Sequence, residues 1–201
     1  MSIEAVGDDA RSQQQAIASL VTAFVRDPVM RWNYPEPEAY LAHFPTFARH
    51  FGGAAFAADG AWRDVRGGGA SLWLPPGVEA DGESIERFVF STLDPSKHET
   101  ATALFGALGE MHPEEPHWYL AMVGVDAAHQ GQGLGSKLIQ AGLERCDRDG
   151  TIAYLESSNP ANLPLYERHG FEVLKEIRIA DAPPIYPMLR RARGEGSRPP
   201  S

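Results

Sequence analysis

The sequence predicts one α/β (α+β) domain in which helices flank a mixed β-sheet. From about residue 117 onward, apolar runs of strand length alternate with amphipathic, helix-like stretches. Strand, helix and strand in succession imply a partly parallel sheet with a right-handed crossover. The chain has 201 residues, of which 43% are apolar, and this suffices to bury one substantial core. We therefore expect a single domain over residues 1–190.

Two helices are expected in the N-terminal part. Apolar residues recur with a period of about 3.6 residues over positions 12–26, and the pair Asp27-Pro28 ends that run. A Pro-rich loop follows, and a second apolar-striped helix over about 40–51 closes at a Gly-Gly pair. Both helices would lie next to a loop that is rich in aromatic side chains.

Two short strands and a broken helix come next. The runs AAFAA (54–58) and GASLWL (69–74) are separated by turn-forming residues, as expected of antiparallel strands joined by a turn. A helical stretch extends over about 83–109, with a break at Asp94-Pro95.

The C-terminal half follows the order βαβαββ. Its segments are a strand at 117–125, a glycine-rich loop, a helix to Asp149, a strand at 151–157, a short helix at 162–170, a strand at 171–179 and a last strand at 185–190. Residues 191–201 are polar and rich in Pro and Gly, and we expect them to be disordered.

Composition and charge disfavour several functional classes. A net charge of −9 argues against a nucleic-acid partner and is compatible with a cationic one. No window approaches the roughly 18 uninterrupted apolar residues of a membrane span, and the start of the chain has no signal-peptide core, so we expect a soluble, cytoplasmic protein. The only cysteine, Cys146, falls in an apolar helical series, which favours a buried filler over a nucleophile. The seven histidines lack metal-ligand spacing, so no metal is expected, and His112 and His117 would be solvated.

The segment HQGQGLGS (129–136) has glycines at alternate positions between a strand and a helix. It lacks the spacing of a Walker A loop, Leu138 stands where G-x-G-x-x-G needs its third glycine, and Ser136 lacks the flanking glycines of a nucleophile elbow. Alternate glycines that open a helix leave N–H groups uncovered beside the positive end of the helix dipole. The loop therefore suits a pyrophosphate, with a merely flexible connection as the alternative.

Residues 130–135 resemble the Q/R-x-x-G-x-G/A signature of the GNAT superfamily of N-acetyltransferases. The downstream NPANLPLYERHGF (159–171) resembles the second family signature, an Asn followed by a Tyr and by Gly-Phe. Together with HWYLAMVGV and the N-terminal AFVRDPVMRW, these motifs are similar to the puromycin N-acetyltransferase branch, most strongly over residues 116–175. The resemblance implies the GNAT fold, in which a mostly antiparallel central sheet is splayed between the strands near 117–125 and 151–157.

The resemblance also implies that acetyl-CoA enters the gap between these two strands. Gly124 marks an expected bulge that would free the neighbouring main chain for the pantetheine amides. The residues implied to hold the cofactor are Val123, Val125, Gln130, Gly131, Gly133, Gly135, Ser136 and Asn162. For Asn162 the alternative role is to cap its own short helix. The candidates for the outer phosphate, which are otherwise solvated charges, are Lys137, Arg168 and His129.

Two residues are candidates for the chemistry. Tyr166 matches the family's tyrosine and would protonate the leaving sulfur, with core packing as the alternative. Glu156 interrupts an apolar strand near its end and would deprotonate the acceptor, hold its charge, or simply lie on the polar face of the strand. The aromatic residues Trp32, Tyr34 and Trp73 would line the acceptor pocket, unless they pack in the core.

These expectations combine into an N-acetyltransferase that moves an acetyl group from acetyl-CoA to a primary amine of a small molecule, by direct attack in a ternary complex. We expect a monomer or homodimer without nucleic-acid or membrane partners. The alternatives are a catalytically silent acyl-CoA-binding sensor module and a protein N-acetyltransferase. A nucleotide-binding protein is disfavoured, because the loop lacks a Walker lysine and a ribose-binding acid. The sequence leaves the acceptor open, and puromycin is one candidate among small amines.

Overall fold

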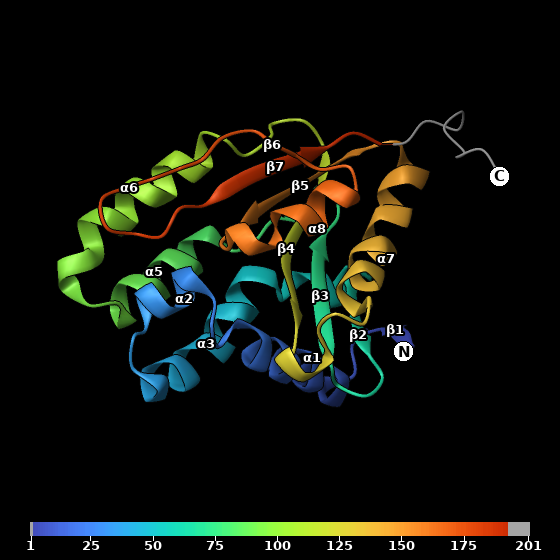
Figure 1. Ribbon diagram of the computed structural model, residues 1–201, viewed down its shortest axis with the longest axis horizontal. Coiled ribbons are helices and arrows are strands. Elements are labelled where there is room, and N and C mark those ends of the chain that lie inside the picture. Colours follow the sequence, from blue (N-terminus) through green and yellow to red (C-terminus); the bar gives the residue numbers. More distant parts are fainter. Residues whose placement is uncertain (1, 193–201) are drawn as a thin grey trace.

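A seven-stranded sheet forms the centre of the described part of the chain, residues 2–192 of the computed structural model (Figure 1). Its strands are β1 (Ile3–Ala5), β2 (Ala61–Asp64), β3 (Gly69–Leu74), β4 (His117–Val125), β5 (Ile152–Ser157), β6 (Glu172–Val173) and β7 (Tyr186–Arg190). They lie in the order β1-β2-β3-β4-β5-β7-β6. Neighbouring strands are antiparallel except for β4 and β5, which are parallel. The predicted mixed, mostly antiparallel sheet is therefore confirmed.

Helices cover both faces of this sheet. They are α1 (Ala10–Phe24), α2 (Pro28–Asn33), α3 (Pro37–Gly52), α4 (Ala54–Ala57), α5 (Gly82–Thr92), α6 (His98–Gly109), α7 (Leu134–Asp149) and α8 (Leu163–Arg168), with the 3-10 turns η1 (Pro95–Lys97), η2 (Ala127–His129) and η3 (Pro160–Asn162). α1 and α3 pack against β3 and β4 on one face, and α7 packs against β2 to β5 on the other (Figure 1). Under α7 the indole of Trp73 is fully buried, and a Cβ at Gly142 would lie 2.3 Å from it. The helix approaches the sheet this closely because residue 142 is glycine.

The N-terminal part contains a helix that the sequence pattern did not indicate. The Asp27 carboxylate accepts a hydrogen bond from the Met30 N–H at 3.0 Å, and Pro28 is the first residue of α2. Asp27 and Pro28 therefore start a new helix as well as ending α1. Much of the expected Pro-rich loop is α2, whereas α1 and α3 confirm the two predicted helices.

The predicted strand at 54–58 is wrong, because residues Ala54–Ala57 form the short helix α4. Alanine has the highest helix propensity, and the run lacks the apolar-polar alternation that favours a strand. The hairpin partner of β3 is β2 instead. The polar start of the chain adds β1, an edge strand that the sequence pattern did not indicate.

The C-terminal elements follow the prediction with one exception. β4, α7, β5 and α8 lie where expected, and the predicted helix over 83–109 breaks into α5 and α6. The run 171–179 forms only the two-residue β6 and one isolated bridge. Val173 and Leu174 remain exposed, so nothing packs over them to extend the strand. From residue 193 onward, the predicted disordered tail 191–201 lies outside the described residues.

The sheet separates between β4 and β5. Their parallel pairing runs from His117 and Ile152 only as far as Leu120 and Leu155. Beyond these residues β4 pairs with β3, and β5 pairs with β7. The main chain of β4 after Leu120 therefore faces a gap on the side of β5. Within the described residues, no helix is long and apolar enough to cross a membrane.

A bulge does occur in β4, but it is not at Gly124. The pairing with β3 shifts between Met122 and Leu120, which makes Ala121 the extra residue. Gly124 pairs regularly with Ala70. A Cβ on Gly124 would lie 2.6 Å from the Cβ of Ala23, so the missing side chain makes room for α1.

Candidate active site

A cleft of about 550 Å³ occupies the gap between the separated strands. One side is formed by the end of α1 and by β4 residues 123–125, and the other by residues from the segment 159–168. The glycine-rich loop and the first turn of α7 close a third side. The residues predicted to hold the cofactor all line this cleft: Val123, Val125, Gln130, Gly131, Gly133, Gly135, Ser136 and Asn162.

The glycines of the loop differ in what they contribute. Gly131 and Gly133 have φ angles of 72° and 80°, in the left-handed region that side chains disfavour. Gly133 is the N-cap of α7, and no side chain caps the first N–H groups of that helix. Because the first turn of α7 lines the cleft, these N–H groups and the positive end of the helix dipole are available to an anion there. Gly135 has ordinary space for a Cβ, which would lie 3.5 Å from Leu165.

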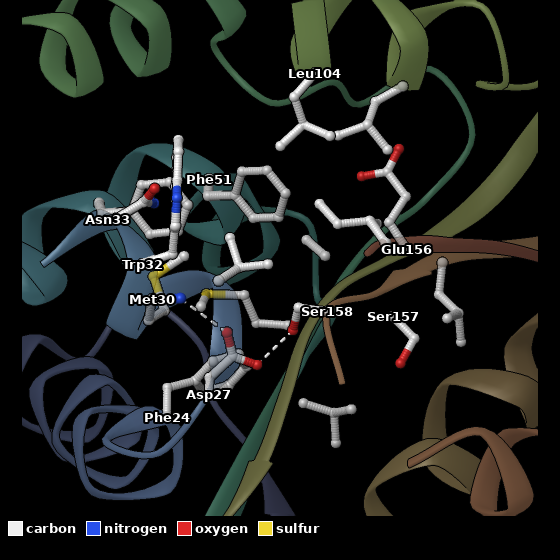
Figure 2. Close-up of a pocket in the computed structure, with 18 of the residues that line it drawn as sticks. Phe24, Asp27, Met30, Trp32, Asn33, Phe51, Leu104, Glu156, Ser157 and Ser158 are labelled. Atoms are coloured by element: carbon white, nitrogen blue, oxygen red, sulfur yellow. Dashed lines mark hydrogen bonds between the residues drawn. The ribbon is translucent and has the colours of Figure 1, made fainter. Parts of the chain in front are cut away.

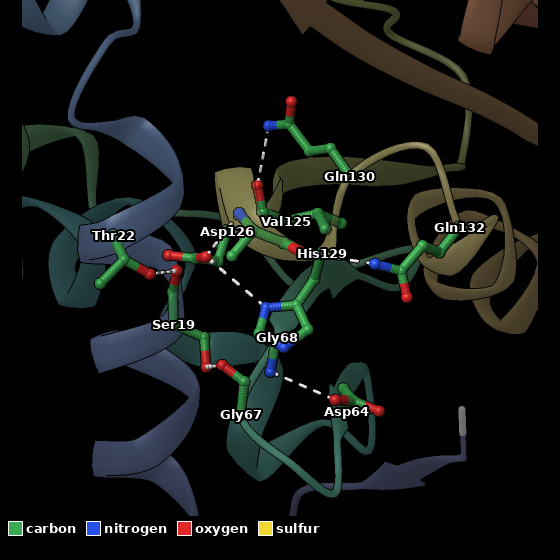
Figure 3. Close-up of polar contacts among 11 residues, drawn as sticks. Ser19, Thr22, Asp64, Gly67, Gly68, Val125, Asp126, His129, Gln130 and Gln132 are labelled. Atoms are coloured by element: carbon green, nitrogen blue, oxygen red, sulfur yellow. Dashed lines mark hydrogen bonds and ion pairs between the residues drawn. The ribbon is translucent and has the colours of Figure 1, made fainter.

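Side-chain contacts fix the loop that precedes α7 (Figure 3). The Gln130 amide donates to the Val125 carbonyl at 3.0 Å, and His129 Nδ1 lies 3.5 Å from an Asp126 carboxylate oxygen. Asp126 also accepts from the Ala128 N–H, and this hydrogen bond is the largest cause that lowers the pKa of Asp126. Gln130 and His129 thus shape the loop as well as lining the cleft.

The far side of the cleft is tied to α7. Ser136 Oγ and His169 Nε2 lie 2.6 Å apart, which joins the first turn of α7 to the residue after α8. Asn162 is the N-cap of α8, but its side chain makes no capping hydrogen bond, whereas Asn159 caps η3 through the Ala161 N–H. The alternative role of Asn162 as a side-chain cap is therefore wrong. Arg168, one of the phosphate candidates, also lines this side.

A second, apolar pocket of about 150 Å³ adjoins the cleft (Figure 2). Residues from α2, α3, α5, α6, β4 and β5 line it. Five residues line both spaces: Phe24, Asp27, Val123, Asn162 and Tyr166. The separation of β4 and β5 thus places a glycine-rich cleft and an apolar pocket side by side.

Tyr166 stands where the cleft and the pocket meet. The residue is 7% exposed, and its ring packs edge-on against Phe171 at 6.2 Å between centroids. Burial, followed by the negative charge of Asp27, raises the pKa of the Tyr166 phenol well above its ordinary value. The hydroxyl therefore keeps its proton at neutral pH.

Glu156 lies in the wall of the apolar pocket beside Leu104, away from Asp27 (Figure 2). The hydroxyls of Tyr119 and Tyr154 donate to its two carboxylate oxygens at 3.0 and 3.1 Å. Burial, followed by the charge of Glu156, raises the pKa of both phenols, so both remain hydrogen-bond donors. The carboxylate is thereby held in one orientation, with 12% of the side chain exposed.

Two histidines lie near Glu156. His112 is exposed and His117 is half-buried, so the prediction that they are solvated holds for His112 and in part for His117. His112 Nδ1 lies 4.0 Å from the Glu156 carboxylate, and the Nε2 atoms of His112 and His117 lie 3.1 Å apart. The His112 ring packs edge-on against Tyr119 and Tyr154. Burial lowers the pKa of His117, which favours its neutral form. The intervening Pro and Glu residues of the sequence hid this arrangement, because they indicate only an exposed turn.

Asp27 is a site residue that the sequence analysis did not assign. It is 7% exposed and lines both spaces. One carboxylate oxygen accepts from the Met30 N–H and the other from the Ser158 hydroxyl, which follows β5 (Figure 2). An Asp before a Pro indicated a helix boundary, but nothing local in the sequence indicated the contact with Ser158.

Of the three aromatic residues predicted to line an acceptor pocket, Trp32 alone lines the apolar pocket. The prediction for Tyr34 is wrong, because the residue is 2% exposed and its hydroxyl lies 2.8 Å from Thr92 Oγ1 within the core. Trp73 is wrong, because it is fully buried beneath α7. The pocket has other aromatic walls, namely Phe24, Phe47, Phe51 and Phe105.

The described residues contain no group of His, Cys, Asp and Glu side chains that could hold a metal ion. Cys146 is buried, as predicted. Burial raises the pKa of its thiol to about 12, so the thiol stays protonated. It does not line the cleft or the pocket.

Sequence relatives of this chain are acetyltransferases. An uncharacterized N-acetyltransferase of Schizosaccharomyces pombe is 29% identical over 191 residues, which cover 85% of this chain and 75% of the yeast protein. The mycothiol acetyltransferase of Mycobacteroides abscessus is 34% identical over 125 residues, 56% of this chain. The match spans 38% of that protein's length.

Solved structures share the fold. The Corynebacterium glutamicum protein described as histone acetyltransferase HPA2 and related acetyltransferase has a TM-score of 0.64 at 26% identity, over 98% of this chain and 99% of that one. Arylalkylamine N-acetyltransferase 2 of Aedes aegypti has a TM-score of 0.62 at 14% identity, over 96% and 99% of the two chains, and this likeness concerns the fold alone. The model of the acetyltransferase (GNAT) family matches residues 31–171, which include β4, the glycine-rich loop and Tyr166. The chain belongs to the GNAT acetyltransferase family.

Proposed function

We propose that this protein transfers an acetyl group from acetyl-CoA to a primary amine of a small molecule, by direct attack in a ternary complex. The observation that carries the proposal is the meeting of two spaces at Tyr166. One is a cleft whose glycine-rich loop suits a pyrophosphate, and the other is an apolar pocket with Glu156 in its wall. Each ligand of an acetyl transfer would thus have a space of its own next to the same phenol.

The residues of the cleft fit the proposed donor, which supplies an acetyl thioester. The uncapped N–H groups of the first turn of α7 would hold the pyrophosphate, since Gly131 and Gly133 keep the approach to them free of side chains. The main chain of residues 123–125 lies beyond the last β4–β5 pair, so it would bond the pantetheine amides. Arg26 and Arg168 add positive charge at the cleft.

Glu156 and Tyr166 would divide the proton transfers. Glu156 accepts a proton from the ammonium group of the acceptor, which frees the nitrogen lone pair for attack on the acetyl carbon. A nitrogen–carbon bond forms while the carbon–sulfur bond breaks, and Tyr166 gives its proton to the departing sulfur. The second proton that the nitrogen must lose restores the Tyr166 phenol, and Glu156 releases its proton to water. Tyr119 and Tyr154 keep Glu156 oriented for its step.

Direct attack is favoured over a covalent acyl-enzyme because the chain has one cysteine. That residue, Cys146, is buried, lies outside both spaces, and keeps its proton. A thiol nucleophile needs its thiolate form and access to the substrate, and Cys146 offers neither.

Replacing Tyr166 with Phe tests the assignment of the acid. We expect Tyr166→Phe to lower kcat by roughly 10²- to 10⁴-fold, the range typical of general acid–base catalysis, because the leaving sulfur loses its proton donor. Thiol release from acetyl-CoA measures kcat, and calorimetry should show that CoA binding is retained. Tyr186→Phe is the control, because its hydroxyl donates to Glu176 outside both spaces. Full kcat in Tyr166→Phe would remove the assigned acid.

The same assay separates the alternatives. CoA binding without thiol release across a broad amine panel would favour a silent acyl-CoA-binding module and contradict the proposal. Turnover restricted to protein lysines or N-termini would favour a protein N-acetyltransferase instead.

A further inference from the structure

We propose that the acceptor is a compact monoamine whose apolar part is a single aromatic ring, without a carboxylate and without a second cation. The inference rests on the proposed function and adds the class of acceptor to it. Three features of the apolar pocket support it: its size, its apolar lining, and the hydrogen bonds and charges of its two carboxylates.

The size of the pocket admits about one ring. Its volume is about 150 Å³, and an apolar protein cavity of about 150 Å³ accepts a benzene molecule. A second fused ring would require the pocket walls to move. Packed protein interiors resist such movement, because extra atoms force side chains out of their preferred rotamers.

The lining of the pocket is apolar on the side formed by α3, α5 and α6. Val89, Ala101, Leu104, Phe105 and Leu108 line it from α5 and α6, and Phe47 and Phe51 line it from α3. Phe47 and Phe51 stack on each other with ring centroids 5.3 Å apart. Phe51 faces the middle of the pocket in Figure 2. A ring placed there would exchange water for aromatic and aliphatic contacts.

The charges of the pocket suit one ammonium group and no other ion. The described residues that line it include two carboxylates, Asp27 and Glu156, and no Lys, Arg or His. Both oxygens of each carboxylate accept hydrogen bonds, but burial also raises the pKa of Asp27, which favours its neutral form. The two phenols that orient Glu156 do not neutralise its charge, and the nearest imidazole nitrogen, His112 Nδ1, is 4.0 Å away. Glu156 therefore remains as the partner of a single ammonium.

Three classes of amine fit the pocket poorly, two because of their charges and one because of its size. The far cation of an aliphatic diamine would be buried without a partner, and the carboxylate of an amino acid would meet no cation. An amine with two fused rings would exceed the volume of the pocket. Puromycin combines an aromatic ring with a nucleoside and is expected to be a poor acceptor.

A matched panel of amines tests the inference. Initial rates of thiol release from acetyl-CoA should give 2-phenylethylamine a kcat/KM about 100-fold or more above those of phenylalanine and 1,5-diaminopentane, because these two bury an unpaired charge. Phenylalanine differs from 2-phenylethylamine by the carboxylate, and the diamine replaces the ring with a second cation. In a thermal melt with CoA in place of acetyl-CoA, no transfer can occur. 2-Phenylethylamine should then raise the Tm of the protein, and the diamine should not.

Two variants test the size of the pocket. Phe51→Ala removes a ring from the wall, so kcat/KM for 2-(1-naphthyl)ethylamine should rise relative to 2-phenylethylamine. Phe88→Ala is the control, because it removes a partly buried ring of α5 that does not line the pocket. The ratio of kcat/KM for the naphthyl amine to kcat/KM for the phenyl amine should remain that of the parent.

The outcomes separate the two proposals. Thiol release with phenylalanine or the diamine as fast as with 2-phenylethylamine would overturn the acceptor class and leave the acetyl transfer standing. Thiol release with no amine of any class, despite CoA binding, would overturn the proposed function itself.

Discussion

Asp27 serves three parts of the molecule at once. It ends the run of α1, caps α2, and receives a hydrogen bond from Ser158, which lies 131 positions further along the chain. The sequence predicted the helix end, because Asp before Pro is a local signal. The contact with Ser158 could not be predicted, because it depends on how β5 is placed against α1. Glu156 was predicted because it interrupts an apolar strand, and Tyr166 because its segment resembles a family motif; both line the apolar pocket.

The buried carboxyl of Asp27 gives a pH dependence with a definite sign. Burial raises the pKa of Asp27, against the opposing hydrogen bonds from Ser158 and Met30. The native state therefore holds this proton more readily than the unfolded state, so the contribution of Asp27 to stability falls as the pH rises above about 4. Asp27→Asn keeps an acceptor for the Met30 N–H and does not ionise. Relative to the parent, the variant should gain stability as the pH rises above about 4, the ordinary pKa of an Asp carboxyl.

Urea denaturation at several pH values measures this difference. Asp8→Asn, on the exposed stretch before α1, controls for the loss of one negative charge. If the difference in the free energy of unfolding between Asp27→Asn and the parent does not change with pH, the pKa of Asp27 is not raised in the native state.

Among the elements, α7 and the loop before it were predicted best. Their signals are local, because alternate glycines followed by an apolar helical stripe lie within about twenty consecutive residues. α4 and β1 were missed for the opposite reason. A helix of four residues is too short to show a period, and an edge strand of three residues has little apolar alternation. Neighbouring elements determine their structure more than their own sequences do.

The start of α7 permits a test that separates ligand binding from folding. A Cβ at Gly135 meets only ordinary contacts, so Gly135→Ala should not weaken the fold, and alanine adds about 0.5–1 kcal/mol of helix stability over glycine. The methyl group would narrow the cleft where the N–H groups receive the anion. We expect the Kd of CoA to rise roughly tenfold, which corresponds to about 1.4 kcal/mol.

Calorimetry measures the Kd of CoA, and a thermal melt measures the stability of the fold. Gly106→Ala is the matched control, because it lies in α6 with open space around its Cβ and outside the cleft. Unchanged CoA affinity in Gly135→Ala would show that the first turn of α7 does not contact the donor.

At the scale of the whole molecule, the cleft was more predictable than the apolar pocket. The predicted cofactor residues lie within about forty consecutive positions and share family motifs, so one resemblance located them together. The apolar pocket is assembled from α2, α3, α5, α6, β4 and β5. Trp32 and Trp73 were both candidates for the lining of an acceptor pocket, yet Trp32 lines the apolar pocket and Trp73 is buried under α7. Only the packing of distant elements distinguishes them.

Arg190 ties together the elements on two sides of the cleft. From β7, its guanidinium donates two hydrogen bonds to Asp147 on α7, at 2.8 and 2.9 Å, and one to the His169 carbonyl after α8. Arg190 is 3% exposed, so Arg190→Met should lower the free energy of unfolding by about 2–4 kcal/mol through loss of a buried ion pair. It should also raise the KM for acetyl-CoA, because α7 and α8 both line the cleft.

The exposed pair of Arg178 and Glu176 is the control. Arg178→Met should change the free energy of unfolding by less than about 1 kcal/mol. Urea denaturation and steady-state kinetics measure both variants. If the two substitutions change the free energy of unfolding and the KM equally, Arg190 does not hold α7 and the segment after α8 together.

The wall that the cleft shares with the pocket has a thermodynamic consequence. Because Phe24, Val123 and Tyr166 touch both spaces, a ligand in one space restricts side chains that the other ligand must contact. The affinity of each ligand then depends on the presence of the other, and by linkage the factor is the same in both directions. Selectivity for the amine would therefore be a property of the pair of ligands, and amine affinities measured without CoA would understate it.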